Sequence, residues 1–88
     1  MSIDDLLAIF RRSRRRWRLF HSDDTMECRI TELPTGVEIR FEYCGELYHS
    51  FVHATRADAE READEKRREL IQAGWSEHAA GEAGQAAP

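Results

Sequence analysis

Apolar residues near the start of the chain recur at the spacing of a helix. Ser2 precedes Asp4 and Asp5, an arrangement typical of a helix N-cap followed by acids in the first turn. The apolar residues that share one helical face are Ile3, Leu6, Leu7 and Phe10. The spacing therefore predicts a short N-terminal helix over about Ile3 to Ser13.

From Arg16 to His53 the period changes to two, which is typical of strands with one buried face. The predicted strands cover about 16–21, 26–32, 37–43 and 46–53. Turn residues separate them at Asp23-Asp24, at Leu33 to Gly36 and at Cys44-Gly45. These turns favour a four-stranded antiparallel meander.

The strand registers follow from the requirement that apolar residues share a face, because a slip of one residue turns a strand over. One row across the sheet then contains Trp17, Ile30, Ile39 and Ser50. The predicted inner face contains Trp17, Leu19, Met26, Cys28, Ile30, Val37, Ile39, Phe41, Tyr43, Tyr48 and Val52. This face needs a covering layer.

A second helix supplies that layer. Thr55 is the expected N-cap, with Asp58 as the acid of a capping box, and Gly74 is the expected stop signal. The predicted helix runs from about Arg56 to Ala73. Its thin apolar stripe contains Ala59, Ala63, Leu70 and Ala73, and small residues allow a close approach to the sheet. The residues expected to close one end of the core are Ile71 and Trp75.

Chain length and composition set the fold class. The 88 residues, 41% of them hydrophobic and 34% charged, are enough for one lean core. We expect a single α+β domain over 1–75 and a disordered C-terminal tail over 76–88. The acidic N-terminus and the absence of a long apolar run favour a cytoplasmic protein with no membrane partner. The two cysteines do not imply a disulfide scaffold.

The charge is unevenly distributed. The formal net charge is -4, yet the segment from Arg11 to Arg18 carries six of the thirteen basic residues and no acid. All six are arginines, whose planar guanidinium groups match phosphate and carboxylate. Two interpretations are open: contact with nucleic acid, or pairing with the acidic helix of the same chain.

The predicted registers place a cationic row on the outer face of the sheet, formed by Arg18, Arg29, Arg40 and His49. Like charges directly opposite one another destabilise a sheet, so such a row favours an anionic ligand. Neighbouring Glu27 and Glu42 offer the alternative of a neutralised, solvated surface. Phe20, Leu47 and Phe51 are expected on the same face, where the first helix, a second copy of the chain or single-stranded nucleic acid would cover them.

Signals for catalysis or metal binding are weak. Cys44, His49 and His53 are expected on the outer face, but their spacing lacks the paired cysteines of a zinc finger. Asp23-Asp24 is typical of a turn. We therefore expect no enzyme, no catalytic residue, no cofactor, no metal and no small-molecule substrate.

The segment from Gly45 to Trp75 contains GELYHSFVHATRADAEREA and ends in LIQAGW. It resembles small bacterial proteins of unknown activity that end in a β-hairpin and an Ala-rich helix. The order of four meandering strands followed by a helix is similar to the repeat of PUR-alpha and Whirly-type single-strand-binding proteins. That similarity implies a fold and no particular binding residue.

The sequence thus predicts a small accessory or regulatory protein that acts through contacts. Nucleic acid, single-stranded rather than double-stranded, is the leading partner. The candidate contact residues are Arg11, Arg12, Arg14, Arg15, Arg16, Trp17, Arg18, Phe20, Arg29, Arg40, His49 and Phe51. The alternative is a protein–protein interaction module, either a homodimer or an inhibitor-like or immunity-like protein that uses its acidic helix.

Overall fold

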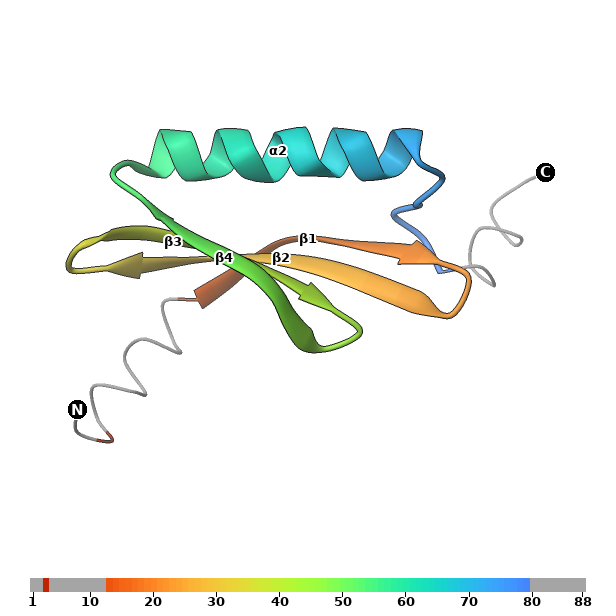
Figure 1. Ribbon diagram of the computed structural model, residues 1–88, viewed down its shortest axis with the longest axis horizontal. Helices are drawn as coiled ribbons and strands as arrows, with labels where there is room; N and C mark the ends of the chain where they lie inside the picture. The colour runs from red at the N-terminus through yellow and green to blue at the C-terminus, as the bar shows by residue number, and fades with distance from the viewer. Residues whose placement is uncertain (1–2, 4–12, 80–88) are drawn as a thin grey trace.

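The structure is a computed structural model that describes Ile3 and residues 13–79 (Figure 1). Its elements are β1 (Ser13–His21), β2 (Asp24–Leu33), β3 (Gly36–Tyr43), β4 (Glu46–His53) and α2 (Arg56–Gln72). The four strands form one antiparallel sheet in the order β1-β2-β3-β4. The α+β class and the antiparallel meander are confirmed, whereas the predicted N-terminal helix lies outside the described residues.

The sheet keeps one predicted register and changes another. Between β2 and β3, Ile30 lies opposite Ile39, as predicted. Between β1 and β2, Trp17 lies opposite Cys28 and not Ile30, so the predicted register is wrong by two residues. The turn falls one residue earlier than expected, because Ser22 adopts a left-handed φ of 53°. A shift of two leaves Trp17 and Leu19 on their predicted face.

The β3–β4 hairpin turns where the sequence predicts, at Cys44-Gly45, and Tyr43 pairs with Glu46. A β-bulge at Tyr48 then adds one residue to β4, so that Phe41 lies opposite His49. A bulge reverses the facing of the strand beyond it. The inward position predicted for Val52 is therefore wrong: Val52 shares the outer face with Glu38, and Phe51 lies opposite Ile39 on the inner face.

The core lies between the sheet and α2. Trp17 and Phe41 meet at its centre, with ring centroids 5.9 Å apart. The buried apolar residues are Trp17, Leu19, Met26, Cys28, Ile30, Val37, Ile39, Phe41, Ala59 and Ala63. Every member from the sheet was predicted on the inner face. Tyr43 and Tyr48, also predicted there, are largely exposed at the margin of the sheet.

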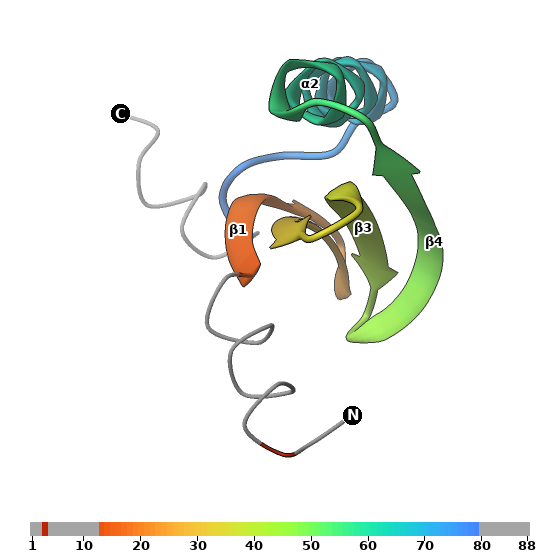
Figure 2. The same ribbon diagram turned by 90° about the vertical axis from the view of Figure 1, so that its left-hand side faces the viewer.

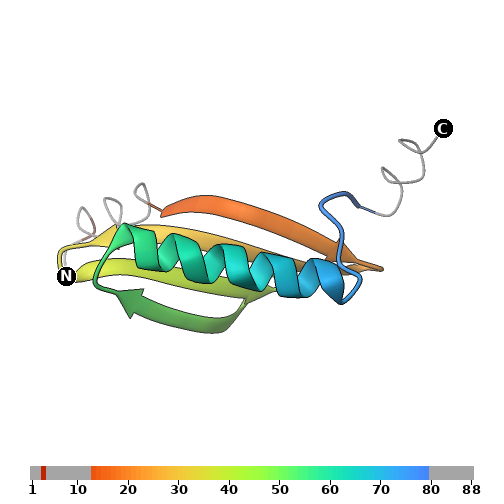
Figure 3. The ribbon, with the colours of Figure 1, turned by 90° about the horizontal axis from the view of Figure 1, so that it is seen from above.

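Helix α2 begins and ends almost where the sequence predicts. The side chain of Thr55 accepts a hydrogen bond from the backbone N–H of Asp58, which closes the N-terminus. Ala59 and Ala63 are fully buried, and Trp17 Nε1 donates a 2.9 Å hydrogen bond to the carbonyl of Ala63. The helix runs along the middle of the sheet, between its two outer strands (Figure 3). Small residues thus permit the close approach.

The chain returns to the sheet after α2. Gly74 adopts a left-handed φ of 104°, and Trp75 packs near Tyr43, with ring centroids 6.4 Å apart. Ser76 then exchanges two backbone hydrogen bonds with Phe20 on β1, of 2.7 and 2.8 Å. Trp75 closes one end of the core as predicted, but Ile71 remains 39% exposed. The predicted domain 1–75 and tail 76–88 stay predictions, since residues 80–88 are outside the described part.

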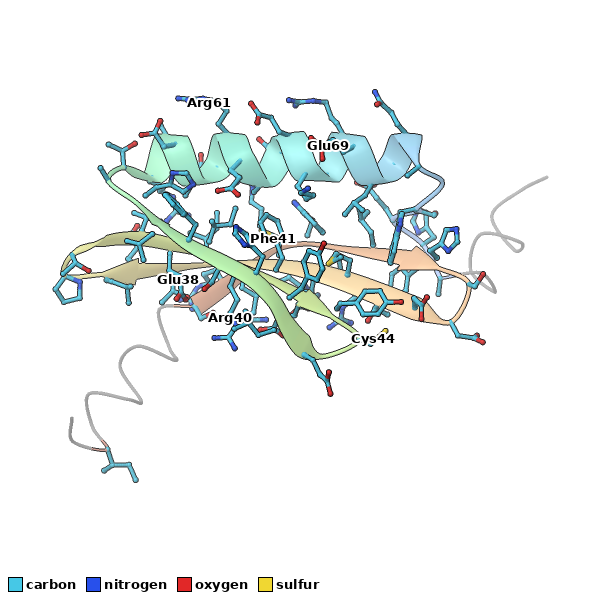
Figure 4. All side chains as sticks on the ribbon, in the orientation of Figure 1. Glu38, Arg40, Phe41, Cys44, Arg61 and Glu69 are labelled. Carbon is cyan, nitrogen blue, oxygen red and sulfur yellow. The ribbon has the colours of Figure 1, made fainter. Side chains whose placement is uncertain are left out.

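The described part of the molecule has two layers, a sheet and one helix. Figure 2 shows α2 on one face and β4 curving toward it, and no other described helix or strand covers the opposite face. Phe41 points toward the helix, whereas its neighbour Arg40 points away from it (Figure 4). The two faces therefore present different chemistry.

Candidate functional site

The outer face carries a row of arginines, with a composition different from the predicted one. Arg29 lies opposite Arg40, as predicted, and Arg15 lies opposite Arg29. Arg18 lies opposite Glu27, and Ser50 lies opposite Arg40 in the place predicted for His49. The register shift between β1 and β2 moves Arg18 out of the row, and the bulge in β4 puts Ser50 in the place of His49. The observed row is Arg15, Arg29, Arg40 and Ser50.

Glu27 is the centre of this surface. Its carboxylate lies 2.9 Å from Arg18, 3.1 Å from Arg29 and 3.6 Å from Arg15. Burial pushes the pKa of Glu27 upward, but the hydrogen bonds from Arg29 and Arg18 outweigh that effect and hold the pKa below its ordinary value. Next to it, Arg40 Nε lies 3.1 Å from Glu42 Oε2, close enough for an ion pair but not aligned as a hydrogen bond. The glutamates thus neutralise much of the arginine row.

Arg16 belongs to the opposite surface. It occupies a second β-bulge, between Arg15 and Trp17, and reaches α2. Its guanidinium group lies 3.3 Å from Asp64 and 3.7 Å from Glu60. This is the pairing between the arginine segment and the acidic helix that the sequence offered as the alternative to nucleic-acid contact.

The remaining candidate residues are scattered. Trp17 is 8% exposed in the core, so its ring is not accessible for stacking on a base. Arg14 is exposed near the start of β1, and Phe20 is half-buried beside Ser76. The bulge places Phe51 and His49 on the helix side. Two candidates, Arg11 and Arg12, lie outside the described residues.

Strand β4 is the least buried strand of the sheet. Seven of its eight residues are exposed, and only His53 is half-buried. Its large apolar side chains are substantially exposed: Leu47 at 54%, Tyr48 at 68%, Phe51 at 53% and Val52 at 44%. Within residues 13–79, no strand pairs with its outer edge. An exposed apolar strand with unpaired backbone groups is a template for another strand.

A shallow groove separates β4 from α2. It has a volume of about 470 Å³ and is lined by Phe41, Tyr48, His49, Glu62 and Lys66. The ring of His49 stacks on Phe41, with centroids 6.1 Å apart. Glu62, which lines the groove, also reaches the end of β4: its Oε1 lies 2.5 Å from Nε2 of His53. These contacts fix the inner side of β4 while its edge stays open.

The cysteines and histidines do not gather. Cys44 lies in the hairpin turn with its thiol 3.6 Å from Asp24 Oδ1, whereas His49 and His53 face the helix side. The expectation that all three share the outer face is therefore wrong. No group of three potential metal ligands occurs in the part of the chain that the structure describes. Burial raises the pKa of the Cys28 thiol to about 12, which suppresses its thiolate.

Comparison with protein families, with curated proteins and with solved structures finds no match to this chain. Across the described residues, no helix combines the length and apolar character needed to cross a bilayer. Function must therefore be argued from the geometry of the surfaces.

Sequence reasoning missed the importance of β4. The last strand of a meander is necessarily at an edge, and the run Leu47-Tyr48-His49-Ser50-Phe51-Val52 carries too many large side chains for a solvated one. Those two signals were available. The bulge that turns Phe51 inward and Val52 outward was not, because it leaves no trace in composition.

Proposed function

We propose that this protein is a small non-enzymatic interaction module that binds another protein chain by accepting a strand at the free edge of β4. The observation that carries the proposal is the exposure of Leu47, Tyr48, Phe51 and Val52 on an unpaired edge strand. In this mode of recognition, main-chain hydrogen bonds supply affinity and the alternating side chains supply specificity.

The charge distribution supports the same conclusion. Arg15, Arg16, Arg18, Arg29 and Arg40 each form an ion pair with a carboxylate of the same chain. Phosphate contacts would have to compete with those carboxylates. The large apolar residues of β4, in contrast, remain 44–68% exposed.

The proposal is tested with synthetic peptides and ¹⁵N-labelled protein at low concentration. The probes are an eight-residue peptide of alternating valine and threonine, and the same peptide methylated on alternate backbone nitrogens. We expect the first peptide to shift the amide resonances of β4 and to leave those of α2 unchanged. The methylated peptide cannot complete a ladder and should have no effect. Equal shifts with both peptides would contradict strand addition. So would the absence of shifts with either peptide at millimolar concentration. The titration is repeated on diluted protein, so that self-association at the edge does not exclude the peptide.

A second candidate is binding of single-stranded nucleic acid, favoured by one observation. Three guanidinium groups surround the single carboxylate of Glu27, which leaves a local excess of two positive charges on β1 and β2. Phosphate neutralisation by these groups would give affinity that falls steeply with salt.

The test is a fluorescence-polarisation titration with labelled single-stranded and double-stranded oligonucleotides at low and physiological salt. The variant Arg15→Glu/Arg18→Glu should abolish binding, whereas Arg61→Glu/Arg68→Glu on α2 is the charge-matched control. Arg16 is unsuitable for this purpose because it is bound to Asp64. Binding that both double variants lose equally would reflect net charge alone, and no binding at low salt would remove this candidate.

A further inference from the structure

The edge of β4 is complementary to itself. We infer that two copies of this chain pair through antiparallel β4 strands, with a two-fold axis at Ser50, to form one continuous sheet. The inference rests on the proposed function, since it names the strand that the edge accepts.

The facing of the side chains restricts the possible registers. A two-fold axis that relates adjacent antiparallel strands is perpendicular to the sheet, so the inner face of one copy continues into the inner face of the other. The inner face of β4 carries His49, Phe51 and His53. They lie opposite Phe41, Ile39 and Val37 of β3, respectively. Leu47, Ser50 and Val52 alternate with them on the outer face. Any accepted register must match inner residues with inner ones.

With the axis at Ser50, every pair matches in face and in chemistry. Ser50 lies opposite itself, so the closest approach on the axis involves two small side chains. On the inner face, His49 lies opposite the second copy's Phe51, two flat rings. Beyond the bulge at Tyr48, Leu47 lies opposite the second copy's Val52 on the outer face. Cross-strand aliphatic and aromatic pairs of this kind stabilise a sheet.

The polar residues at the ends of the strand also match. Counting across the bulge, Glu46 comes opposite the second copy's His53, whose Nε2 contacts Glu62 of its own chain, so an acid and an imidazole meet at both ends of the paired ribbon. Each copy supplies one member of each pair, as an isologous interface requires. This complementarity favours a second copy over an unrelated strand.

Neighbouring registers are worse. An axis at Phe51 would place Ser50 opposite Val52, would set His49 against His53, and would leave Glu46 beyond the end of the second strand. An axis at His49 would place two imidazoles against each other and would leave Val52 and His53 beyond the end of the second strand. Of these three registers, the Ser50 register alone satisfies the facing and the size of the side chains together.

Nothing in the described fold blocks this approach. Viewed from above, β4 lies along part of one long side of the sheet, and α2 lies beside it over the middle of the sheet (Figure 3). After pairing, the two α2 helices would lie on the same face, one on each side of the joined strands. The groove lined by Tyr48 and His49 would then have a counterpart across the axis.

The first experiment measures mass by sedimentation equilibrium over a wide range of concentration. We expect a species of twice the 10.2 kDa chain mass. Leu47→Lys/Val52→Lys should weaken association by about 100-fold or more, because it places like charges opposite each other on the outer face. Ile71→Lys, which charges an exposed apolar residue of α2, is the matched control and should remain dimeric.

The second experiment tests the register without disturbing the surface. In a Cys44→Ser background, Ser50→Cys should form an intermolecular disulfide rapidly on mild oxidation, since residues opposite one another across a sheet have suitable Cα separations. His49→Cys alone should not, but a mixture of His49→Cys and Phe51→Cys chains should cross-link. Cross-linking at His49 alone, or a dimer in which Ser50→Cys stays reduced, would overturn the register.

The outcomes separate this inference from the proposed function. A chain that stays monomeric at the highest concentration but binds the valine-threonine peptide at β4 would overturn the self-pairing and leave strand addition standing. A chain that neither associates nor binds the peptide would overturn both. Circular dichroism of each variant verifies that α2 is folded.

Discussion

Glu27 shows how one carboxylate organises the outer face of the sheet. Without it, Arg15, Arg18 and Arg29 would repel one another across neighbouring strands. The partly buried carboxylate accepts charge-assisted hydrogen bonds from Arg18 and Arg29, which are stronger than neutral ones. The arginine row is therefore as much a structural feature as a binding surface.

The first prediction concerns the pH dependence that Glu27 confers. Its pKa in the folded protein is lower than its ordinary value of 4.5, so it adds stability above that pH, and this contribution is lost as the pH falls through the folded pKa. Glu27→Gln should lower the free energy of unfolding at pH 7 by about 1–3 kcal/mol. Urea titrations from pH 7 to pH 3 should show the difference from wild type shrinking. A difference that stays constant would mean that charge is irrelevant at this site.

The second prediction compares two glycines with positive φ. A Cβ on Gly36 would lie 2.4 Å from the carbonyl oxygen of His53, whereas a Cβ on Gly45 would meet nothing within 4 Å. Gly45→Ala should cost only its backbone strain, about 1–2 kcal/mol. Gly36→Ala should cost about 1–3 kcal/mol more, because β4 must move away from β3. Thermal denaturation of both variants measures the difference, and equal losses would refute the close contact.

Helix α2 packs closely on the sheet through small residues. Ala59 and Ala63 are fully buried, and the indole of Trp17 reaches the helix backbone at Ala63. Toward the end of the helix, Leu70 packs against the same core. Ion pairs near the surface, such as Arg16 with Asp64, contribute little individually. Apolar packing therefore carries most of the attachment.

A third prediction follows for those alanines. Ala63→Leu forces three extra carbons into a filled interface and should destabilise the protein by about 1–3 kcal/mol. Ala57→Leu makes the same change on the exposed side of the helix and should alter stability by less than about 0.5 kcal/mol. Chemical denaturation followed by tryptophan fluorescence reports both. A tolerated Ala63→Leu would indicate that the helix is loosely docked.

Much of this architecture could be predicted from the sequence because it depends on local signals. Alternating apolar residues placed the buried residues of β1 to β3 on the correct face, and Thr55 and Gly74 marked the ends of the helix. The two bulges, at Arg16 and Tyr48, could not be predicted, since an added residue changes neither composition nor turn signals. They matter most for function: one sends Arg16 to the helix, and the other determines which side chains of β4 face outward.

The core of the described residues is thin. Within residues 13–79 one helix covers the sheet, and the hydrophobic core includes residues of β1, β2 and β3 but none of β4. A small domain with so thin a core gains substantially from any further apolar burial. Association through β4 would supply that burial, which connects the stability of the fold to its proposed partner.

The last prediction uses this connection. If chains pair through β4, dilution favours unfolding by mass action, and the melting temperature should rise with protein concentration. A hundredfold increase corresponds to about 1.4 kcal/mol per chain, which for a domain of this size is a shift of roughly 5–10 °C. Leu47→Lys/Val52→Lys should melt at one temperature throughout, whereas Ile71→Lys should retain the dependence. Differential scanning calorimetry across that range measures it, and a wild-type melting temperature independent of concentration would show that the fold is stable without a partner strand.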